Sequence, residues 1–345
     1  MTRTTPLKWF GAAALTFSLL ASTSACSDPA SGDTGGGGKE QVSIVGFSIL
    51  KTANKQLVED FQKTDAGKDV EFKESYGASG DQARAVIAGL KADQVHLSLE
   101  PDMTKLTDEQ LVADDWKSGA NKGIITQSVV AIVVRKGNPK NIQNWDDLVK
   151  PGVKIVTPNP GSSGSAKWNI LAAYGHILAG GGSDADAQAY LKKFLANVAA
   201  FPGSAKDATT AFEGGTGDVL LSYENEAIQA RAAGADFDYV IPEQTLLIEN
   251  PGAVTEDASD AAKAFLDFQL SKEGQTDYAK QGFRPLDDTV KVDVEGANDP
   301  ADAFPAPQTL LTIDGDFGGW GEANTKYFDE ENGIVTKLIA ASGKS

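Results

Sequence analysis

A glycine- and serine-rich turn has the sequence Thr157-Pro158-Asn159-Pro160-Gly161-Ser162-Ser163-Gly164-Ser165-Ala166-Lys167-Trp168-Asn169 and joins a strand-like segment, 153–156, to a helix-like one. Small residues let the backbone approach a ligand closely, and the first N–H groups of a helix point outward and favour negative charge. The serine hydroxyls add further donors. The turn therefore predicts an anion-binding site. An ordinary capped helix needs the same residues, so this turn alone leaves both interpretations open.

The same order of strand, small-residue turn and helix occurs at three places: Ser79-Gly80, Ser163-Gly164-Ser165 and Gly203-Ser204-Ala205. In open α/β sheets, ligands bind at the carboxyl ends of the strands. Each turn is expected to lie at such an end. We therefore expect the three helix N-termini to face one cleft.

The donor groups of these turns indicate which anion would bind. A fully ionised tetrahedral oxyanion carries no proton and needs only donors, whereas a protonated phosphate also needs an acceptor. Hydroxyl and backbone donors therefore favour a sulfate-like ligand. Asp81 and Asp207 follow two of the turns and are expected to complement the helix dipoles, although either carboxylate would also serve as an acceptor.

From residue 41 onward, strand-like and helix-like segments alternate, which is typical of an α/β fold with a largely parallel sheet. Strands are expected at 42–47, 70–76, 95–99, 126–134, 153–156 and 219–223. Helices are expected from 81 and from 206, and at 184–197, 261–269, 272–281 and 324–341. Helical spacing makes Ala83, Val86, Ile87 and Leu90 the expected buried face of the helix that begins at Asp81.

The crossings between segments suggest two lobes. A long β-rich run, 126–134, is expected to cross into the second lobe, and 219–223 to cross back. The expected boundaries are 41–125 and 228–345 for lobe 1 and 126–227 for lobe 2, with hinges near 123–127 and 222–228. The C-terminal helices are expected to pack on the first lobe.

Composition allows two lobes and excludes some partners. The chain has 345 residues, of which 41% are hydrophobic, enough for one large core or for two domains of ordinary size, and two lobes are the default expectation. A formal charge of −17 disfavours binding to nucleic acid or to an anionic membrane surface. A small anion remains compatible with this charge because helix ends and hydroxyls act locally.

The first 25 residues have the pattern of a signal peptide. Arg3 and Lys8 form a short basic region, 10–21 an apolar one, and Ser24-Ala25-Cys26 a small-residue cleavage site. Residues 26–40, with four successive glycines at 35–38, have no apolar periodicity and are expected to form a flexible tether.

Cys26 is the only cysteine and resembles the lipidated cysteine of bacterial lipoproteins, although Thr23 stands where that pattern usually has leucine. An ordinary secretory signal with an incidental cysteine is the alternative. The expected location is therefore extracytoplasmic, at the outer face of the cytoplasmic membrane, with membrane contact only through the lipid anchor.

Residues 42 to about 328 resemble the bacterial sulfate and thiosulfate substrate-binding proteins of ABC importers. The matching motifs are Val134-Arg135-Lys136-Gly137-Asn138-Pro139-Lys140, Asn144-Trp145-Asp146-Asp147-Leu148-Val149-Lys150-Pro151-Gly152-Val153, Pro158-Asn159-Pro160 with Ser162-Ser163-Gly164, Gly217-Asp218-Val219-Leu220, Glu224-Asn225-Glu226-Ala227, Phe283-Arg284-Pro285 and Phe317-Gly318-Gly319-Trp320. The resemblance implies a two-lobed periplasmic-binding-protein fold of type II that closes on a dehydrated oxyanion. It also implies delivery to an ABC-type membrane permease, with no cofactor and no catalysis.

The resemblance also implies which residues contact the ligand. They supply hydroxyl, phenol or backbone donors and are Ser48, Ser79, Ser163, Gly164, Ser165, Ala205 and Tyr223. Tyr223 stands where the family has a tryptophan, Ser165 where its better-known members have glycine, and Ser48 in a turn that departs from the family pattern. Sulfate, thiosulfate and related oxyanions such as phosphate or molybdate stay open.

A secreted serine hydrolase and an adhesive surface lipoprotein are the functions from other classes. The run Gly161-Ser162-Ser163-Gly164-Ser165 lacks the final glycine of a G-x-S-x-G nucleophile turn. His96 and His176 are the only histidines and have the setting of structural residues, in a strand and in a helix. No H-E-x-x-H motif or cysteine pair occurs, so the sequence gives no sign of a metal site.

Overall fold

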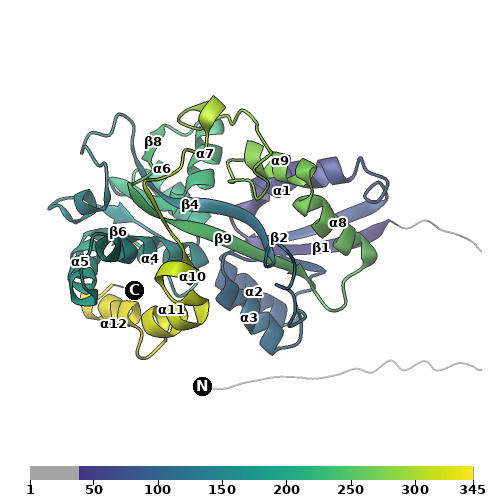
Figure 1. The fold of residues 1–345 in the computed structure, drawn as a ribbon, viewed down its shortest axis with the longest axis horizontal. Coiled ribbons are helices and arrows are strands. Elements are labelled where there is room, and N and C mark those ends of the chain that lie inside the picture. Colours follow the sequence, from purple (N-terminus) through teal and green to yellow (C-terminus); the bar gives the residue numbers. More distant parts are fainter. Residues whose placement is uncertain (1–38, 345) are drawn as a thin grey trace, which may run out of the picture. The chain divides into compact units, whose positions relative to one another are not determined.

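A computed structural model describes residues 39–344, so the predicted signal peptide 1–25, Cys26 and most of the tether 26–40 lie outside the described residues. Within this range ten strands form one hydrogen-bonded sheet (Figure 1). The strands are β1 (Glu40–Phe47), β2 (Val70–Gly77), β3 (Gln94–His96), β4 (Ile124–Arg135), β5 (Ile155–Val156), β6 (Val198–Ala200), β7 (Val219–Tyr223), β8 (Phe237–Val240), β9 (Gln244–Val254) and β10 (Thr309–Leu311).

The sheet consists of two parallel parts joined by two antiparallel strands. Its order is β2-β1-β3-β9-β4-β7-β5-β6, with β10 paired to β9 and β8 to β4. The pairs β2-β1-β3 and β7-β5-β6 are parallel, whereas β9 runs antiparallel to β3 and to β4. The predicted α/β fold with largely parallel sheet is therefore confirmed in both parts.

The strand β4 links the two parts because its halves have different partners. Residues 124–129 pair with β9, and residues 130–134 pair with β7. Its valine- and isoleucine-rich run is fully buried from Val129 to Val134, as expected for a central strand covered on both faces. The predicted crossing at 126–134 thus corresponds to the middle of the sheet.

Helices cover both faces of the β2-β1-β3 part. On one face α1 (Leu50–Phe61), α8 (Asp260–Leu270) and α9 (Lys272–Lys280) pack together over β1. The aromatic rings of Phe61, Phe72, Phe265 and Phe268 meet there at centroid distances of 4.9 to 6.0 Å. On the other face lie α2 (Ser79–Ile87) and α3 (Glu100–Asp108) (Figure 1).

The remaining helices pack around the β7-β5-β6 part and the centre of the sheet. They are η1 (Trp145–Val149), α4 (Gly164–Ala179), α5 (Asp184–Asn197), α6 (Ala205–Glu213), α7 (Glu224–Ala232), η2 (Pro300–Asp302), α10 (Ile313–Asp316), α11 (Gly319–Phe328) and α12 (Ile334–Ser342). The fully buried side chains of Trp145, Trp168, Tyr174 and Phe194 belong to the core beneath α4 and α5. No helix within residues 39–344 is long and apolar enough to cross a bilayer.

Several predicted boundaries agree with the structure and others do not. The helix α5 and the strand β7 have the predicted bounds. The helix α2 begins at Ser79, two residues before the predicted start at Asp81, and ends at Ile87. Ile87 and Leu90 are each 39% exposed, so their assignment to its buried face was wrong. The helix α3 and the strands β8, β9 and β10 were not predicted.

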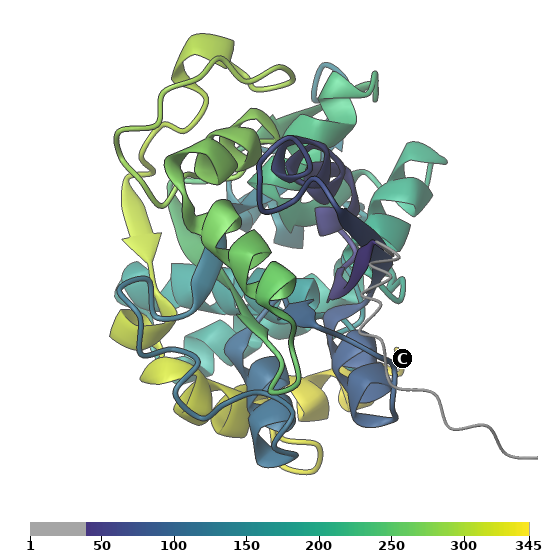
Figure 2. The ribbon, with the colours of Figure 1, turned by 90° about the vertical axis from the view of Figure 1, so that its right-hand side faces the viewer.

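The end of the chain packs differently from the prediction. Of the C-terminal helices expected on the first lobe, α8 and α9 pack there with α1 and β1. The expected helix 324–341 is two helices, of which α11 contacts α3 and α12 contacts α5. The ring centroids of Trp168 and Trp320 lie 4.7 Å apart, and those of Tyr174 and Tyr327 5.0 Å apart, which ties α11 to α4. Both views place α11 and α12, in yellow, away from α8 and α9, in green (Figure 1, Figure 2). An amphipathic pattern predicts a buried face but does not identify the element that covers it.

The expected return crossing also lies elsewhere. The segment 219–223 is β7, which pairs with β4 and β5. After α7 the chain forms β8, which again pairs with β4, and only β9 leads back to β3. The connection between the two parts therefore runs through β4 and β9, and the predicted hinge near 222–228 differs from this arrangement.

Candidate functional site

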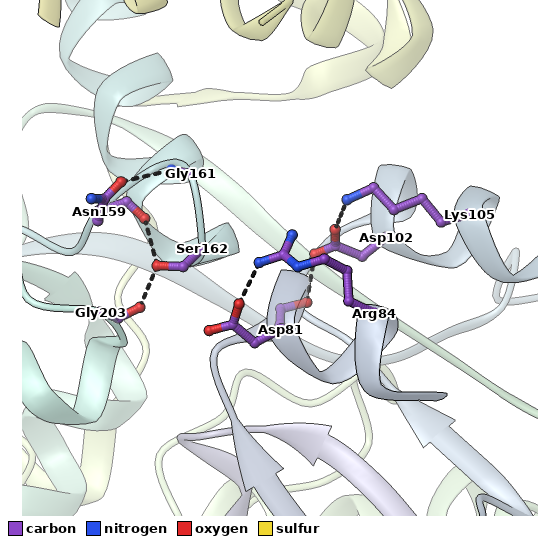
Figure 3. Close-up of polar contacts among 9 residues, drawn as sticks. Asp81, Arg84, Asp102, Lys105, Asn159, Gly161, Ser162 and Gly203 are labelled. Carbon is purple, nitrogen blue, oxygen red and sulfur yellow. Dashed lines mark hydrogen bonds and ion pairs between the residues drawn. The ribbon is translucent and has the colours of Figure 1, made fainter. Parts of the chain in front are cut away.

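The three predicted turns meet at the carboxyl ends of the parallel strands. The Gly80 N–H donates to the Ser162 carbonyl at 3.1 Å, and Ser162 Oγ donates to the Gly203 carbonyl at 2.7 Å. The Asn159 N–H also donates to the Pro202 carbonyl at 2.8 Å. Figure 3 shows the Asn159–Ser162 turn and Gly203 opposite α2. Helix N-termini that follow β2, β5 and β6 are thus brought together, as the sequence predicted.

The turn that begins α4 has donors that the fold leaves available. Ser163 is the N-cap residue, but its side chain makes no capping hydrogen bond, and its N–H donates to the Asn159 carbonyl at 2.9 Å. Gly164 and Ser165 begin the helix, where N–H groups have no intrahelical acceptor. Ser165 Oγ is buried and has no hydrogen-bond partner among the described residues. The arrangement can therefore donate to an anion from backbone and hydroxyl groups.

Gly164 is required by a close approach between this turn and the segment after β3. A Cβ atom at Gly164 would lie 2.5 Å from Ser98 Oγ and 2.8 Å from Leu99 Cδ2. Contacts below 3.0 Å do not occur between real Cβ atoms and their neighbours, so any side chain would push the two segments apart. The glycine thus sets the distance between α4 and Ser98.

Ser98 joins the site residues to one another. Its N–H donates to Ser79 Oγ at 2.9 Å, and its Oγ lies 2.6 Å from the Tyr223 hydroxyl. Its carbonyl accepts from Trp168 Nε1 and from Asn250 Nδ2, both at 2.9 Å. This residue was not predicted as part of the site, because the strand expected at 95–99 included it, whereas β3 ends at His96.

Tyr223 ends β7 and is completely buried. Burial raises the pKa of its phenol far above the usual value, so the hydroxyl remains protonated. Either oxygen of the Ser98–Tyr223 pair can be the donor. When Ser98 donates, the phenol proton of Tyr223 is available to a ligand.

Ser79 differs from the serines of the α4 turn because its hydroxyl is already bonded. Ser79 Oγ donates to Asp102 Oδ2 at 2.7 Å, and Asp102 Oδ1 accepts from Lys105 Nζ at 2.9 Å. Figure 3 shows the Asp102–Lys105 pair on α3 beside Arg84 and Asp81. Asp102, which is 4% exposed, was not predicted as part of the site.

The two acids that were considered as acceptors belong to helix starts. Asp81 pairs with Arg84 on the same helix. Asp207 accepts from the hydroxyl of the α6 cap residue Ser204 at 2.8 Å and donates its N–H back to Ser204 Oγ at 3.1 Å. Their expected role beside the helix dipoles is confirmed by this placement.

Ala205 and Ser48 lie at the edges of this group. Ala205 is the first residue of α6 and is 4% exposed, next to the Gly203 carbonyl that binds Ser162. Ser48 follows β1 and is half-buried. Its link to the other residues runs through its neighbour Phe47, whose ring centroid lies 6.2 Å from that of Tyr223. Ser48 is thus the least closely connected of the seven predicted residues.

A lysine lies in the first turn of α4. Lys167 Nζ donates to Asn324 Oδ1 at 2.8 Å and sits 4.9 Å from the centroid of the Phe328 ring. Burial lowers the pKa of Lys167 to about 8, although the charge of Asp102 opposes this shift. The lysine therefore interacts with α11 rather than with the serines of its own turn.

The histidines are engaged away from the turn serines. His96 Nε2 lies 3.2 Å from Thr126 Oγ1, and burial lowers the pKa of His96 to about 3, which keeps the ring neutral. His176 contacts Gln244 and Asp146. The described residues contain no group of three or more His, Cys, Asp or Glu side chains that could hold a metal ion.

Comparison with known proteins identifies the class to which this fold and site belong. The family of bacterial extracellular solute-binding proteins matches residues 43–284. The chain belongs to this family, within the group of sulfate- and thiosulfate-binding proteins. It is 38% identical over 344 residues to the sulfate-binding protein of Synechococcus elongatus, with 96% of each chain covered.

Two further relatives support this placement. The thiosulfate-binding protein of Escherichia coli is 34% identical over 309 residues, which cover 86% of this chain and 89% of that protein. The solved structure of SubI, the sulfate-binding protein of Mycobacterium tuberculosis, has a TM-score of 0.79 and 43% identity, and it covers 84% of this chain and 100% of that one. The fold is therefore that of the periplasmic binding proteins.

Proposed function

We propose that this chain is an extracytoplasmic receptor that binds sulfate or thiosulfate and delivers it to an ABC-type membrane permease. The observation that carries the proposal is the convergence of donor groups from α2, α4 and β7 around Ser98. Those groups are neutral hydroxyls and backbone amides at helix N-termini, which suit a fully ionised oxyanion. The names of the relatives agree with this ligand class.

The ligand contacts proposed are Ser48, Ser79, Ser163, Gly164, Ser165, Ala205 and Tyr223. The partnerless hydroxyl of Ser165 supports this set most directly, because a buried donor without a partner in residues 39–344 costs free energy that a bound oxyanion would recover. Ser98 is added as a positioning residue, since its hydroxyl pairs with that of Tyr223.

Ligand capture is proposed to close two lobes on each other about β4 and β9. The Gly80–Ser162 hydrogen bond joins the N-terminus of α2 to the turn before α4, and so to the opposite part of the sheet. Cys26 is proposed to carry the lipid that anchors the receptor at the outer face of the cytoplasmic membrane. Mass spectrometry of the chain from membranes, which would show an acylated N-terminal Cys26, tests that anchor.

A receptor for protonated phosphate is the second candidate, because Asp102 places a buried acceptor next to Ser79. Competition among sulfate, thiosulfate, molybdate and phosphate, measured by calorimetry between about pH 5 and pH 9, separates the candidates. We expect sulfate or thiosulfate to bind most tightly at every pH, because neither takes up a proton in this range. Tightest binding of phosphate, with an affinity that follows its protonation, would contradict the proposal.

A serine hydrolase would need a base beside a turn serine. In the described residues the proton of Ser79 goes to Asp102, and His96 and His176 bond to Thr126, Gln244 and Asp146. These contacts favour a binding site over a nucleophile and its base. The relatives are likewise named as binding proteins.

A further inference from the structure

Asp102 is a buried carboxylate that touches the proposed anion site. Its side chain is 5% exposed, and both of its oxygens are hydrogen-bonded, Oδ2 to Ser79 Oγ at 2.7 Å and Oδ1 to Lys105 Nζ at 2.9 Å. A carboxylate beside an anion site repels the ligand, so its presence there needs a physical reason.

The hydrogen bonds of Ser79 supply that reason. A serine hydroxyl has one proton and two lone pairs. Ser79 gives its proton to Asp102 and accepts the Ser98 N–H with a lone pair at 2.9 Å. In this arrangement Ser79 has no proton left for an oxyanion. To donate to the ligand, it must release Asp102.

We propose that Asp102 sets the affinity of the oxyanion site by competing with the ligand for the hydroxyl proton of Ser79. This inference rests on the proposed function. When an oxyanion binds, Ser79 turns its proton from the carboxylate to the ligand, and Asp102 keeps its bond to Lys105. When the ligand leaves, the Ser79–Asp102 bond forms again and lowers the free energy of the unliganded state, which favours release.

The charges around Asp102 fit this exchange. Lys105 lies on the same helix and is about half-exposed, so it remains with Asp102 in either state. Lys167 is close enough for the charge of Asp102 to raise the lysine pKa against the larger effect of burial. The positive charges of Lys105 and Lys167 therefore offset the negative charge of Asp102 after the Ser79 hydroxyl has turned to the ligand.

The test measures sulfate affinity of the full chain by calorimetry, for the wild type and for Asp102→Asn. An asparagine has the same shape but accepts only a neutral hydrogen bond, which is about half as strong as the bond to a carboxylate. We expect sulfate to bind about tenfold more tightly to Asp102→Asn. In a Ser79→Ala background the same substitution should change the affinity less than about twofold, because no hydroxyl remains to be released.

Two controls keep other causes apart. Asp108→Asn removes a charge from an exposed position of the same helix α3, and its sulfate affinity should equal that of the wild type. If thermal unfolding shows that Asp102→Asn does not fold, the sulfate affinity of Ser79→Ala alone tests the inference. A loss of affinity below about threefold supports the exchange, because the lost ligand bond is offset by the lost Asp102 bond, and a larger loss contradicts it.

The outcomes are distinct from those of the proposed function. If the wild type binds sulfate but Asp102→Asn binds it equally or more weakly, this inference is wrong and the proposed function stands. An equal gain with and without the Ser79 hydroxyl also overturns it, because simple charge repulsion would then explain the gain. A wild-type chain that binds no oxyanion overturns the proposed function and this inference together.

Discussion

The helices α2 and α4 begin with nearly the same sequence but differ in how their hydroxyls are used. Ser79-Gly80 opens α2, and Ser163-Gly164-Ser165 spans the start of α4. Ser79 Oγ has two partners inside the protein, whereas Ser165 Oγ has none in residues 39–344. The two turns nevertheless lie against each other through the Gly80–Ser162 bond.

A Ser/Gly turn at a helix start is therefore not by itself a set of free donors. The neighbours that packing brings to the turn decide whether its hydroxyl proton is available. At α2 the neighbour is the carboxylate of Asp102, which comes from another helix. At α4 it is the side chain of Ser98, whose Oγ and Cβ atoms come so close that only glycine fits at position 164.

The largest expected effect on sulfate affinity comes from a side chain at position 164, where the start of α4 lies against Ser98. Gly164→Val should abolish sulfate binding, because a side chain would collide with Ser98 Oγ and Leu99 Cδ2 and block the backbone from the ligand. Calorimetry checks the affinity. Gly321→Ala is the matched control, since Gly321 also lies in the first turn of a helix but has no atom within 4 Å of the added Cβ. Wild-type affinity in Gly164→Val would remove this turn from the site.

Removal of single hydroxyls should separate the two turns most clearly. Ser165→Ala should raise the free energy of unfolding of the ligand-free chain by about 1 kcal/mol, because it removes a buried hydroxyl without a partner in the described residues. It should also weaken sulfate binding about tenfold. Ser79→Ala should do the reverse, with lower stability and little change in affinity, since it removes two internal bonds.

Thermal unfolding without ligand and calorimetry with sulfate measure both quantities for the two variants. Equal effects on stability would show that the hydroxyls have equivalent surroundings. A greater loss of affinity in Ser79→Ala than in Ser165→Ala would reverse the assigned roles of the two turns.

A smaller effect is expected from the lysine beside the α4 turn. Lys167→Met should weaken sulfate binding less than about tenfold, because helix N-termini and hydroxyls rather than a counter-charge hold the anion. Titration with sulfate at pH 7 measures this change. A loss of affinity greater than about tenfold would show that Lys167 contributes directly to binding.

Lys167 should also leave a signature in the pH dependence of stability. Its pKa of about 8 in the fold lies below the ordinary value of 10.5, so the folded chain holds fewer protons than the unfolded chain between these values. Stability should therefore rise as the pH rises through this window, by on the order of 1 kcal/mol, and Lys167→Met should lack the rise. Denaturant unfolding at pH 7 and at pH 10 measures the difference.

The last effect is expected in acid and concerns His96, which lies two residues before Ser98, the residue that contacts both turns. Burial lowers its pKa to about 3, whereas the unfolded chain takes up a proton near 6.5. As the pH falls from 6.5 towards 3, stability should fall, by on the order of 1 kcal/mol per pH unit, and His96→Gln should reduce this slope. A slope that is the same in both proteins would exclude His96 as its cause.

Much of the fold was predictable because its signals are local. The 184–197 helix has apolar residues at helical spacing, the 219–223 strand is a short and mostly apolar run, and the structure has both with the expected bounds. The convergence of the three turns followed from the rule that parallel strands present their carboxyl ends at one edge.

The missed residues depend on contacts between distant segments. Ser98 meets Tyr223, which is 125 residues away in sequence, and Asp102 meets Ser79 across 23 residues. A single serine after a short strand and an acid on a helix look like ordinary surface residues until packing buries them. The prediction of the element against which α12 packs was wrong for the same reason, because the apolar faces of α4 and α5 give no local sign of what covers them.

The most direct test of the account is a calorimetric titration of the wild-type chain with sulfate, followed by thiosulfate. We expect one-to-one binding of one or both anions, with heat that disappears in Gly164→Val. Absence of heat with sulfate, thiosulfate, molybdate and phosphate alike would contradict it.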